Sequence, residues 1–509
     1  MINQPTKIAV VVDSVQVYKW QKTLIELLSQ KENISIFLIN LNSSTSLNTV
    51  QYYGYYFLQT IDALLFRTPI DALQKQHLKL NFFTLTWLQA NKVDLVWDLT
   101  GKLALHELDS NSLKFGIWQL SYNNDNKDCL SVAYQSLFSK QSLIDVYLNC
   151  YRHKRYAQQK IASISQEGYS INRTNNSYLW RLTYLLVEKF DVFLFDRKSW
   201  LVKKGLLLIN NGYFYNFKSI FIFRIYLFFI LRKLISYQKK YYEQWRLAII
   251  CLNTKQVYDI RIASDRFWAD PFIVDFNNKL YIFFEELFFK ENRGKLKVAE
   301  LSKDFKVTNE KIILEQSYHL SYPNVFLFAD YYYLLPETAD NNTLELYQAV
   351  DFPYHWQRVH YIMQDIKAYD PTLIEYQGLW YLFVTMKPHV ACSSHDSLYI
   401  FYAESPLSQH WQAHQQNPVI VNAAFARPAG QFFWQDNQLY RPSQNCAGSY
   451  GKAININKVC KLTPLEYEEI LIDQYSTTLD ANTLGTHTWN KYENIAVSDK
   501  LYRQVHYDC

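Results

Sequence analysis

The chain has 509 residues, 52 basic against 47 acidic side chains, and aromatic residues at 17% of its positions. This length predicts two to four domains, and a net charge of only +5 argues against nucleic acid as a partner. The 12 glycines fall far below the roughly 7% that is usual, so Asn and Asp are expected to form many turns. Seven scattered cysteines without a C-x-x-C pair argue against a disulfide framework or zinc site and favour a reducing compartment.

Residues 1–195 are predicted to form an α/β domain with a parallel sheet. Strand-like runs at residues 8–12, 34–42, 93–101 and 115–122 alternate with segments of helical periodicity, and residues 151–195 are predicted to be mainly helical. The sequence contains no G-x-G-x-x-G and no P-loop, so no cofactor is predicted. The N-terminal stretch lacks the longer apolar core of a signal peptide, so a cytoplasmic location is expected.

Residues 196–242 are predicted to be an apolar, basic helical linker. Its segment SIFIFRIYLFFILRKLI, residues 219–235, is short of the roughly 20 uninterrupted apolar residues that a membrane span needs. An inter-domain helix is the favoured interpretation. Peripheral contact with an anionic membrane through 219–235 and a true span are the alternatives.

From residue 243 onward the sequence repeats. Four segments align on Pro271, Pro323, Pro371 and Pro428, and each has an apolar strand, a short polar turn and an aromatic strand. A spacing near 50 residues with about four strands per unit is typical of a β-propeller. A fifth unit fits at 486–501, and the strand-like EQWRLAIICLN at 243–253 is expected to close the ring. Residues 243–509 are therefore predicted to form a five-bladed propeller, with four or six blades as alternatives.

The residues before the aligned prolines are predicted to face one another across the central channel. They are Asp270, Tyr322, Asp370 and Arg427, with His487 as the equivalent in the fifth unit. Paired carboxylates are what glycoside cleavage uses, whereas a guanidinium and aromatic rings suit binding of a sugar or sugar phosphate. The structural alternative is that each Asp-Pro only caps a turn, and both interpretations stay open at this point.

Further polar residues flank these strands. Each is more readily explained by a structural role or a contact at the rim, but together they are candidate substrate-binding residues: Glu285, His319, Arg441 and Gln444, with Glu337 as a candidate catalytic group. No Ser-His-Asp arrangement and no metal-ligand spacing is found, so no metal is predicted.

Residues from about 243 to the C-terminus resemble the N-terminal domain of plant glucosamine inositolphosphorylceramide transferase, a domain that also occurs in bacterial proteins. The motifs that carry the resemblance are EQW at 243, RFWADPF at 266, HLSYPNVF at 319, LPET at 335, FPYHW at 352, DPTL at 370, NPV at 417, ARPAGQFF at 426, LYRPSQNC at 439, YGKAI at 450 and HTWN at 487. This domain is similar to five-bladed glycosidase propellers such as glycoside hydrolase family 43.

The resemblance implies roles for three of the candidates. Asp270 matches the general base of the glycosidases, and Asp370 matches the aspartate that orients and tunes that base. The position of the general acid is occupied by Arg427, which stays protonated and is a poor proton donor. A hydrolase would therefore need another acid, and Glu337 is the candidate.

The first 195 residues more faintly resemble the formyltransferase fold. KIAVVVDS at 7, DLVWDLTG at 94, FGIWQLSY at 115 and YSINRTNNSYLWRL at 169 carry this likeness. The resemblance implies a catalytic Asn, His and Asp, yet residues 115–128 contain no His. A degenerate domain that binds a sugar nucleotide or a partner is therefore expected.

Three functions follow from these observations. The favoured one is a non-hydrolytic protein that binds a sugar, sugar phosphate or glycolipid head group and assists a separate glycosyltransferase in glycan assembly. Its expected location is the cytoplasm, with peripheral contact with the inner face of a membrane as the alternative stated above. The alternatives are a glycosidase or glycosyl-transfer enzyme that uses Asp270 and Asp370, and a formyl or acyl transferase that acts on an amino sugar.

Overall fold

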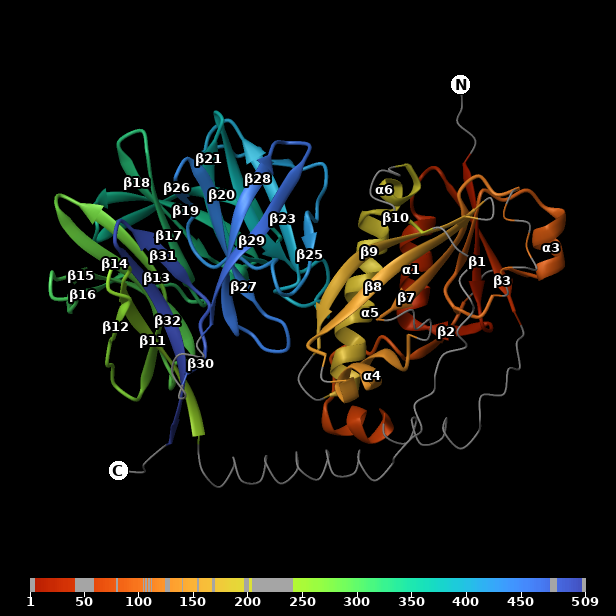
Figure 1. Ribbon diagram of the computed structural model, residues 1–509, viewed down its shortest axis with the longest axis horizontal. Coiled ribbons are helices and arrows are strands. Elements are labelled where there is room, and N and C mark those ends of the chain that lie inside the picture. The colour runs from red at the N-terminus through yellow and green to blue at the C-terminus, as the bar shows by residue number, and fades with distance from the viewer. Residues whose placement is uncertain are drawn as a thin grey trace. The chain divides into compact units, whose positions relative to one another are not determined.

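The computed structural model of the chain is shown in Figure 1. It describes residues 5–41, 59–78, 81–103, 105, 108, 110, 112–123, 129–139, 141–152, 155–166, 170–195, 201–203, 241–476 and 483–505. The chain divides into two compact units, Met1–Arg224 with Pro388–Ser393 and Ile225–Lys387 with Ser394–Cys509. Each unit is described by itself.

The first unit is built on an eight-stranded mixed sheet. Its strand order is β10-β9-β8-β7-β6-β1-β3-β5. The strands from β5 to β7 pair in parallel, whereas β8, β9 and β10 pair antiparallel. The bounds are β1 Thr6–Val12, β3 Ile34–Asn40, β5 Phe82–Phe83, β6 Leu95–Asp98, β7 Gly116–Tyr122, β8 Leu143–Arg152, β9 Arg155–Ser165 and β10 Leu201–Lys203, with β2 Gln16–Tyr18 and β4 Lys75–His77 forming a separate ribbon.

Apolar side chains place the parallel strands inside this unit. Residues Ile8 to Val12 of β1 are at most 1% exposed, as expected for a parallel strand that is covered on both faces. The helix α5 packs against α1, α4 and β9. The helix bounds are α1 Lys19–Ser29, α3 Leu85–Ala90, α4 Val132–Ser139, α5 Ile171–Glu188 and α6 Phe190–Phe195. The predicted α/β unit with parallel strands is confirmed.

The prediction of mainly helical structure for residues 151–195 was wrong in its first part. Residues up to Ser165 complete β8 and β9, and α5 begins only at Ile171, where the Ser170 hydroxyl accepts a hydrogen bond from the Arg173 amide. In β9, residues 162–165 are all buried, and the strand pairs with β8 along its length and with β10 on its other side. These tertiary contacts outweigh the local helical pattern.

The predicted helical linker, residues 196–242, lies mostly outside the described residues. The structure describes only β10 near its beginning and the start of β11 at Tyr241. The segment 219–235 also lies outside them. Among the helices in the described part of the chain, none has the length and apolar character needed to cross a membrane.

The second unit is a ring of five antiparallel sheets, which confirms the predicted five-bladed propeller (Figure 1). Blades 1 to 4 follow one another along the chain, each beginning at its innermost strand. Blade 1 has β13 Arg266–Phe276, β14 Lys279–Phe288, β15 Arg293–Leu301 and β16 Val307–Leu314; blade 2 has β17 Ser321–Phe328, β18 Tyr331–Glu337, β19 Thr343–Asp351 and β20 His355–Gln364; blade 3 has β21 Ala368–Tyr376, β22 Leu379–Met386, β23 Ser397–Ala403, β24 Gln412–Ala413 and β25 Ile420–Val421; blade 4 has β26 Phe433–Gln435, β27 Gln438–Asn445, β28 Ala453–Leu462 and β29 Tyr467–Ser476.

Blade 5 closes the ring with strands from both ends of the propeller. Strand β11, Tyr241–Cys251, pairs over its whole length with β32, Ile495–Val505, as the sequence predicted for residues 243–253. The other strands of this blade are β12 Gln256–Asp259, β30 Thr483–Gly485 and β31 Trp489–Tyr492. An eleven-pair ladder between the first and last strands ties the propeller into a closed ring.

The turns between the first two strands of blades 1 to 4 show why so few glycines suffice. Each is a two-residue turn with both residues at positive φ, at 277–278, 329–330, 377–378 and 436–437. This is the type I′ geometry that matches the twist of paired strands. Asn and Asp tolerate positive φ better than most residues, and five of these eight positions are Asn or Asp.

Hydrophobic packing between neighbouring blades holds the ring together. Five separate apolar clusters are present in the described residues, and each is shared by two adjacent blades. Phe272 of blade 1 and Tyr322 of blade 2, for example, are both fully buried and pack edge to face. The core therefore surrounds the channel and leaves its polar lining to a few residues per blade.

Candidate functional site

Three inner strands begin with the same unusual backbone conformation. Asp270, Tyr322 and Asp370 have φ values of +53°, +49° and +49°, and each lies at a β-bulge where the pairing register shifts. A left-handed backbone conformation costs conformational energy at any residue other than glycine, and a following proline restricts the backbone further. The repeat predicted from the aligned prolines is therefore reproduced in the backbone itself.

Carboxylates of the preceding blade support these three residues. The amide of Asp270 donates to Asp499 Oδ2 at 3.1 Å, and the amide of Tyr322 donates to Asp270 Oδ2 at 3.1 Å. The amide of Asp370 donates to Glu337 Oε2 at 3.0 Å. Charged acceptors make strong hydrogen bonds to backbone amides, so these bonds help to fix the order and spacing of the blades.

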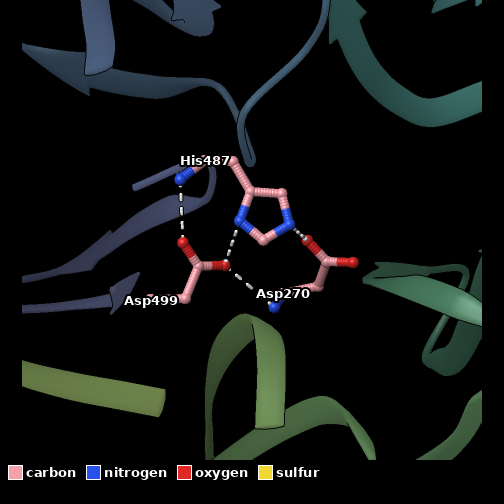
Figure 2. Close-up of side chains that lie close together, drawn as sticks. All are labelled: Asp270, His487 and Asp499. Carbon is pink, nitrogen blue, oxygen red and sulfur yellow. Dashed lines mark hydrogen bonds and ion pairs between the residues drawn. The ribbon is translucent and has the colours of Figure 1, made fainter. Parts of the chain in front are cut away.

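Asp270, His487 and Asp499 form a clasp between blades 5 and 1 (Figure 2). The His487 ring lies between the two carboxylates, with Nε2 3.3 Å from Asp270 Oδ1 and Nδ1 2.8 Å from Asp499 Oδ2. Asp499 Oδ1 also accepts from the backbone amides of His487 and Thr488, and the Thr488 hydroxyl donates to Asp270 Oδ1 at 2.6 Å. All three ionisable side chains are buried.

The electrostatics of the clasp favour a protonated histidine. Burial raises the pKa of Asp270 to about 7, although the neighbouring His487 charge works in the opposite direction. Burial by itself would lower the pKa of His487, but Asp499 and Asp270 beside it raise that pKa to about 9. At neutral pH an imidazolium therefore lies between the two carboxyl groups.

The same three side chains offer oxygen and nitrogen atoms that all lie within 4.8 Å of one another, as a divalent cation site would require. The two ring nitrogens of His487 face different carboxylates, however, so the protonated ring already supplies the positive charge that these carboxylates need. The arrangement is explained without a metal.

Asp370 and Arg427 form a second buried cluster, between blades 3 and 4. The Arg427 guanidinium donates through Nε to Asp370 Oδ2 at 2.6 Å and through Nη2 to Asp370 Oδ1 at 3.1 Å, which makes a bidentate ion pair. Gln444 Nε2 also donates to Asp370 Oδ2 at 2.7 Å, and Glu337 Oε2 lies 3.6 Å from Arg427 Nη2. Arg427, which precedes the aligned proline of blade 4, is thus bound to the aspartate that precedes the aligned proline of blade 3.

This cluster changes the protonation of Glu337. Burial and the nearby Asp370 charge raise the pKa of Glu337 well above its usual range, and Arg427 only partly offsets them. For Arg427 itself burial disfavours the charge, but Asp370 raises its pKa further above the ordinary value. Glu337 is therefore protonated more readily than an ordinary glutamate, whereas Arg427 keeps its charge.

Both candidate catalytic aspartates use both of their oxygens in bonds within the protein. Asp270 accepts from Tyr322, Thr488 and His487, and Asp370 accepts from Arg427 and Gln444. A general base needs an oxygen directed at water or substrate. The geometry therefore favours the blade-linking role for these two residues over proton abstraction.

Glu285 and His319 lie between blades 1 and 2. Glu285 is 4% exposed, and its Oε1 lies 3.2 Å from His319 Nε2. The Gly294 amide donates to His319 Nδ1 at 2.9 Å. Burial by itself would lower the pKa of His319, but Glu285 beside it raises that pKa to about 9. A proton on Nδ1 would, however, lie directly against the Gly294 N–H. Because a donor cannot face a donor, Nδ1 of His319 carries no proton while the Gly294 amide donates to it.

Aromatic residues that the sequence analysis did not select complete the site. Trp245 of β11 lies 4.1 Å from the His487 ring between centroids, and Tyr450 lies 5.4 Å from it. The Arg427 guanidinium carbon lies 5.1 Å from the centroid of the Tyr450 ring and 5.4 Å from that of Tyr369, within the range of a cation–π contact. Tyr450 is 42% exposed, so it presents an aromatic face beside the buried polar clusters.

A signal for these residues was present in the sequence. Trp245 and Tyr450 belong to the EQW and YGKAI motifs, and Tyr369 directly precedes Asp370. Thr488 belongs to the HTWN motif in the same way, whereas Asp499 lies in none of these motifs. The roles of both depend on the closing of the ring between blades 5 and 1.

The remaining predicted site residues lie deeper or elsewhere. The Tyr322 phenol is fully buried, contacts the Thr372 hydroxyl at 2.8 Å and accepts from the Gly430 amide at 2.7 Å. Arg441 donates to both oxygens of Glu469 in the outer strand of blade 4 at 2.7 Å each, apart from the channel clusters. Among the predicted residues, the structure thus brings together Asp270 with His487, Glu285 with His319, and Asp370 with Arg427, Gln444 and Glu337.

Comparisons with known proteins agree with the propeller. The family model described as "Glucosamine inositolphosphorylceramide transferase 1, N-terminal" matches residues 222–502. Relatives of that name from Oryza sativa subsp. japonica and Arabidopsis thaliana are 34% identical over 235 residues and 32% identical over 228 residues. These matches cover 45% and 44% of this chain but only 31% and 29% of the relatives.

Solved structures with a similar arrangement are glycoside hydrolases. The family 117 enzyme Zg3597 from Zobellia galactanivorans is 13% identical with a TM-score of 0.36, over 51% of this chain and 91% of that one. A thermostable family-43 glycoside hydrolase is also 13% identical, with a TM-score of 0.31, over 41% of this chain and 76% of that one.

The family match covers the whole ring of blades together with the clasp and the Asp370–Arg427 cluster. It confirms the resemblance drawn from the sequence motifs. Because the matched residues make up more than half of the sequence, this chain belongs to the glucosamine inositolphosphorylceramide transferase 1 N-terminal family.

Proposed function

We propose that the propeller binds a sugar-containing head group in glycan or glycolipid assembly and does not hydrolyse it. The observation that carries this proposal is the bidentate Arg427–Asp370 pair, which occupies the place of a glycosidase's acid and its tuning aspartate. The relatives are transferases by name, and the name refers to glucosamine and inositolphosphorylceramide. A binding propeller that presents such a head group to a glycosyltransferase accounts for both facts.

The aromatic and polar groups beside the channel suit this ligand class. Tyr450 and Trp245 offer ring faces for the apolar side of a sugar, and Glu285 is a carboxyl group that can accept hydrogen bonds from it. Sugar binding by ring stacking and directional polar contacts needs such a mixture.

The test is calorimetry on the full chain with methyl glucoside, methyl glucosaminide and myo-inositol 1-phosphate, run beside a hydrolysis assay with a panel of nitrophenyl glycosides. Binding of at least one probe without release of nitrophenol is the expected result. Absence of binding to every probe would contradict the proposal.

A second candidate is a glycosidase or glycosyl-transfer enzyme, and the raised pKa of Glu337 favours it, because a general acid must be protonated at working pH. In that case Glu337→Gln and Asp270→Asn would each abolish release of nitrophenol by a folded protein. A matched control is Glu300→Gln, on β15 outside the channel clusters. Turnover with this sensitivity would establish the enzyme and overturn the binding-only proposal.

For residues 1–195 we propose a degenerate formyltransferase-like domain that binds a sugar nucleotide or a partner. The absence of His from residues 115–128 supports the loss of formyl transfer. Calorimetry with a reduced folate checks it: no heat of binding is expected, and tight folate binding would restore the formyl or acyl transferase alternative.

The proposal also includes a location. We place the protein in the cytoplasm, and peripheral contact of the segment 219–235 with the inner face of a membrane is the alternative to an inter-domain helix. The basic residues around this apolar stretch support it. Flotation with vesicles of anionic lipid tests it, with and without 0.5 M salt, which shortens the Debye length from roughly 10 Å at 0.1 M to about 4 Å. A chain that never floats would contradict membrane contact.

A further inference from the structure

The outermost strand of blade 4 exposes more apolar surface than the outer strands of other blades. Strand β29 ends its sheet, and among the described strands it pairs only with β28. Its side chains Ile470, Leu471 and Ile472 are 52%, 46% and 52% exposed. Within the described residues, the outer strands β16, β20 and β12 of blades 1, 2 and 5 each expose a single large apolar side chain, respectively Ile312, Val359 and Val257. A run of three is therefore particular to blade 4.

An edge of this kind is suited to a contact with another polypeptide segment. On its open side β29 presents backbone N–H and C=O groups, and soluble proteins usually protect such edges with charged residues, prolines or a covering element. Exposed apolar residues that adjoin one another mark interaction sites. The exposed Tyr475 continues the surface toward the end of the strand. Residues Ile470, Leu471, Ile472 and Tyr475 together form the apolar edge of blade 4.

A groove between blades 3 and 4 adjoins the apolar edge. Its volume is about 540 Å³, and Ile470 and Leu471 line it on one side while Ile420 of β25 lines it on the other. Asn457 also borders the groove, and its fully buried Oδ1 accepts no hydrogen bond from a described residue. The groove thus has room for apolar side chains and offers an acceptor to a donor group.

The charges around the apolar edge decide which kind of segment fits. Strand β29 carries three carboxylates, Glu468, Glu469 and Asp473, and no basic residue. Arg441 binds Glu469, whereas Glu468 and Asp473 are exposed on either side of the aliphatic run. In an antiparallel pair of two β29 strands centred on Leu471, Glu469 would lie opposite Asp473, and like charges at opposite positions are destabilising. A second copy of β29 is therefore disfavoured, and an apolar segment with basic residues is favoured.

Residues 219–235 of the same chain have this chemistry. Their sequence, SIFIFRIYLFFILRKLI, contains three basic residues and no acidic one. These residues lie outside the described part of the chain, and they end shortly before Tyr241, where β11 begins. The joining residues 236–240 can span up to roughly 20 Å when extended.

The beginning of β11 lies at the same end of the ring as the end of β29. Ala453 pairs with Ser476, so β29 ends beside the start of β28. A Cβ added at Gly451, just before β28, would lie 3.1 Å from the side chain of Trp245 in the first half of β11. A segment that leads into β11 can therefore reach the apolar edge without crossing the ring.

We propose that residues 219–235 dock on the apolar edge of blade 4, with apolar side chains over Ile470, Leu471 and Ile472 and basic groups beside Glu468 and Asp473. This inference goes beyond the proposed sugar binding and does not depend on it. Side chains covered by blade 4 cannot face a membrane at the same time. Docking thus gives the inter-domain interpretation of this segment a defined site.

The test is photo-cross-linking in the full chain, with p-benzoylphenylalanine in place of Leu471. The expected result is a cross-link within one chain to a peptide from residues 219–235, identified by mass spectrometry. The matched control places the same group at Ile312, which is 49% exposed on the outer strand of blade 1. The control is expected to give no cross-link to residues 219–235, and circular dichroism checks that both proteins are folded.

An exchange of charges tests the electrostatic part of the docking. Glu468→Lys together with Asp473→Lys is expected to slow the initial cross-linking roughly threefold, because two attractive surface contacts become repulsive. Arg232→Glu together with Lys233→Glu should slow it to a similar extent. All four substitutions in one chain should restore the rate, because the charges are again complementary.

The other outcomes overturn the docking. A cross-link between two chains would show that a second copy covers the apolar edge. No cross-link to residues 219–235, or equal cross-linking from Leu471 and Ile312, would show that the segment does not dock there. A rate that the fourfold variant fails to restore would contradict the placement of the basic groups. Sugar binding is measured separately by calorimetry, so failure of the proposed function and failure of the docking are distinguishable.

Discussion

Blades 1 and 2 carry a glutamate at the same place, and they use it differently. Glu337 of blade 2 accepts the Asp370 amide and lies beside Arg427, so it is part of the frame. Glu285 of blade 1 accepts no amide of the next blade, because Asp270 has taken that role, and it contacts only His319 among the described side chains. The difference shows how equivalent positions of a repeat can be compared. A buried polar side chain that makes no hydrogen bond to the next blade is a better candidate for a ligand contact than one that does.

The largest effect on stability is expected from removing the positive charge of Arg427, which lies beside Glu337 of blade 2. Arg427→Met should lower the free energy of unfolding by about 3–5 kcal/mol, because Asp370 is left as an uncompensated buried charge. Urea unfolding of the full chain measures it. Arg358→Met is the control, since that side chain is 45% exposed at its contact with Glu345. A loss below about 1 kcal/mol would mean that Asp370 does not need Arg427.

The clasp of blade 5 should make stability depend on pH. The folded-state pKa of His487 is raised from 6.5 to about 9, so the stabilisation is fully present below pH 6.5 and is lost as pH rises through 9. The loss is on the order of 3 kcal/mol. Asp270, whose pKa is raised to about 7, acts in the same direction at lower pH.

Urea midpoints at pH 6.5 and pH 9.5 measure this dependence, with His487→Gln as the comparison. The variant is expected to lose most of the pH dependence between these two values. An unchanged slope in His487→Gln would show that another group is responsible, and that the clasp is not held by an imidazolium.

A direct pair of variants tests the two glutamates against each other. Glu337→Met should cost about 1–3 kcal/mol because the Asp370 amide loses its acceptor. Glu285→Met, of similar size, should be close to neutral within about 1 kcal/mol, since only His319 loses a partner. Equal losses in urea unfolding would remove the distinction between a structural and a spare carboxylate.

The smallest effect on stability is expected at the exposed aromatic face. Tyr450→Ala should change stability by less than about 1 kcal/mol, because the side chain is 42% exposed. The affinity for whichever sugar probe binds should nevertheless fall roughly twofold to tenfold through the lost ring contact. Tyr331→Ala, at the exposed turn of blade 2, is the control and should leave affinity unchanged. Unchanged affinity in Tyr450→Ala would exclude this face from the binding site.

Much of the propeller could be predicted because a repeat makes each blade a check on the others. The aligned prolines located the inner strands, and the left-handed backbone at Asp270, Tyr322 and Asp370 shows that the alignment had found equivalent positions. In the first unit, residues 151–165 were misassigned because β9 owes its conformation to its neighbours β8 and β10 and not to local preference.

The site was predicted less completely, for a physical reason that single residues make clear. The sequence could name Asp270, Arg427 and His487 as neighbours around a channel, since equivalent blade positions must converge. It could not show that Asp270 accepts the Tyr322 amide or that Arg427 holds both oxygens of Asp370. Asp499 and Thr488 escaped notice because only ring closure brings them to Asp270.

The sequence by itself determined the periodic pattern: five apolar and aromatic repeats, their turns, and the residue types that reach the channel. These depend on local spacing and side-chain chemistry, which a linear chain already contains. Only the tertiary structure decided which carboxylates accept hydrogen bonds from the next blade and which one does not. That outcome depends on distances of about 3 Å between residues up to 229 positions apart, and no local pattern encodes them.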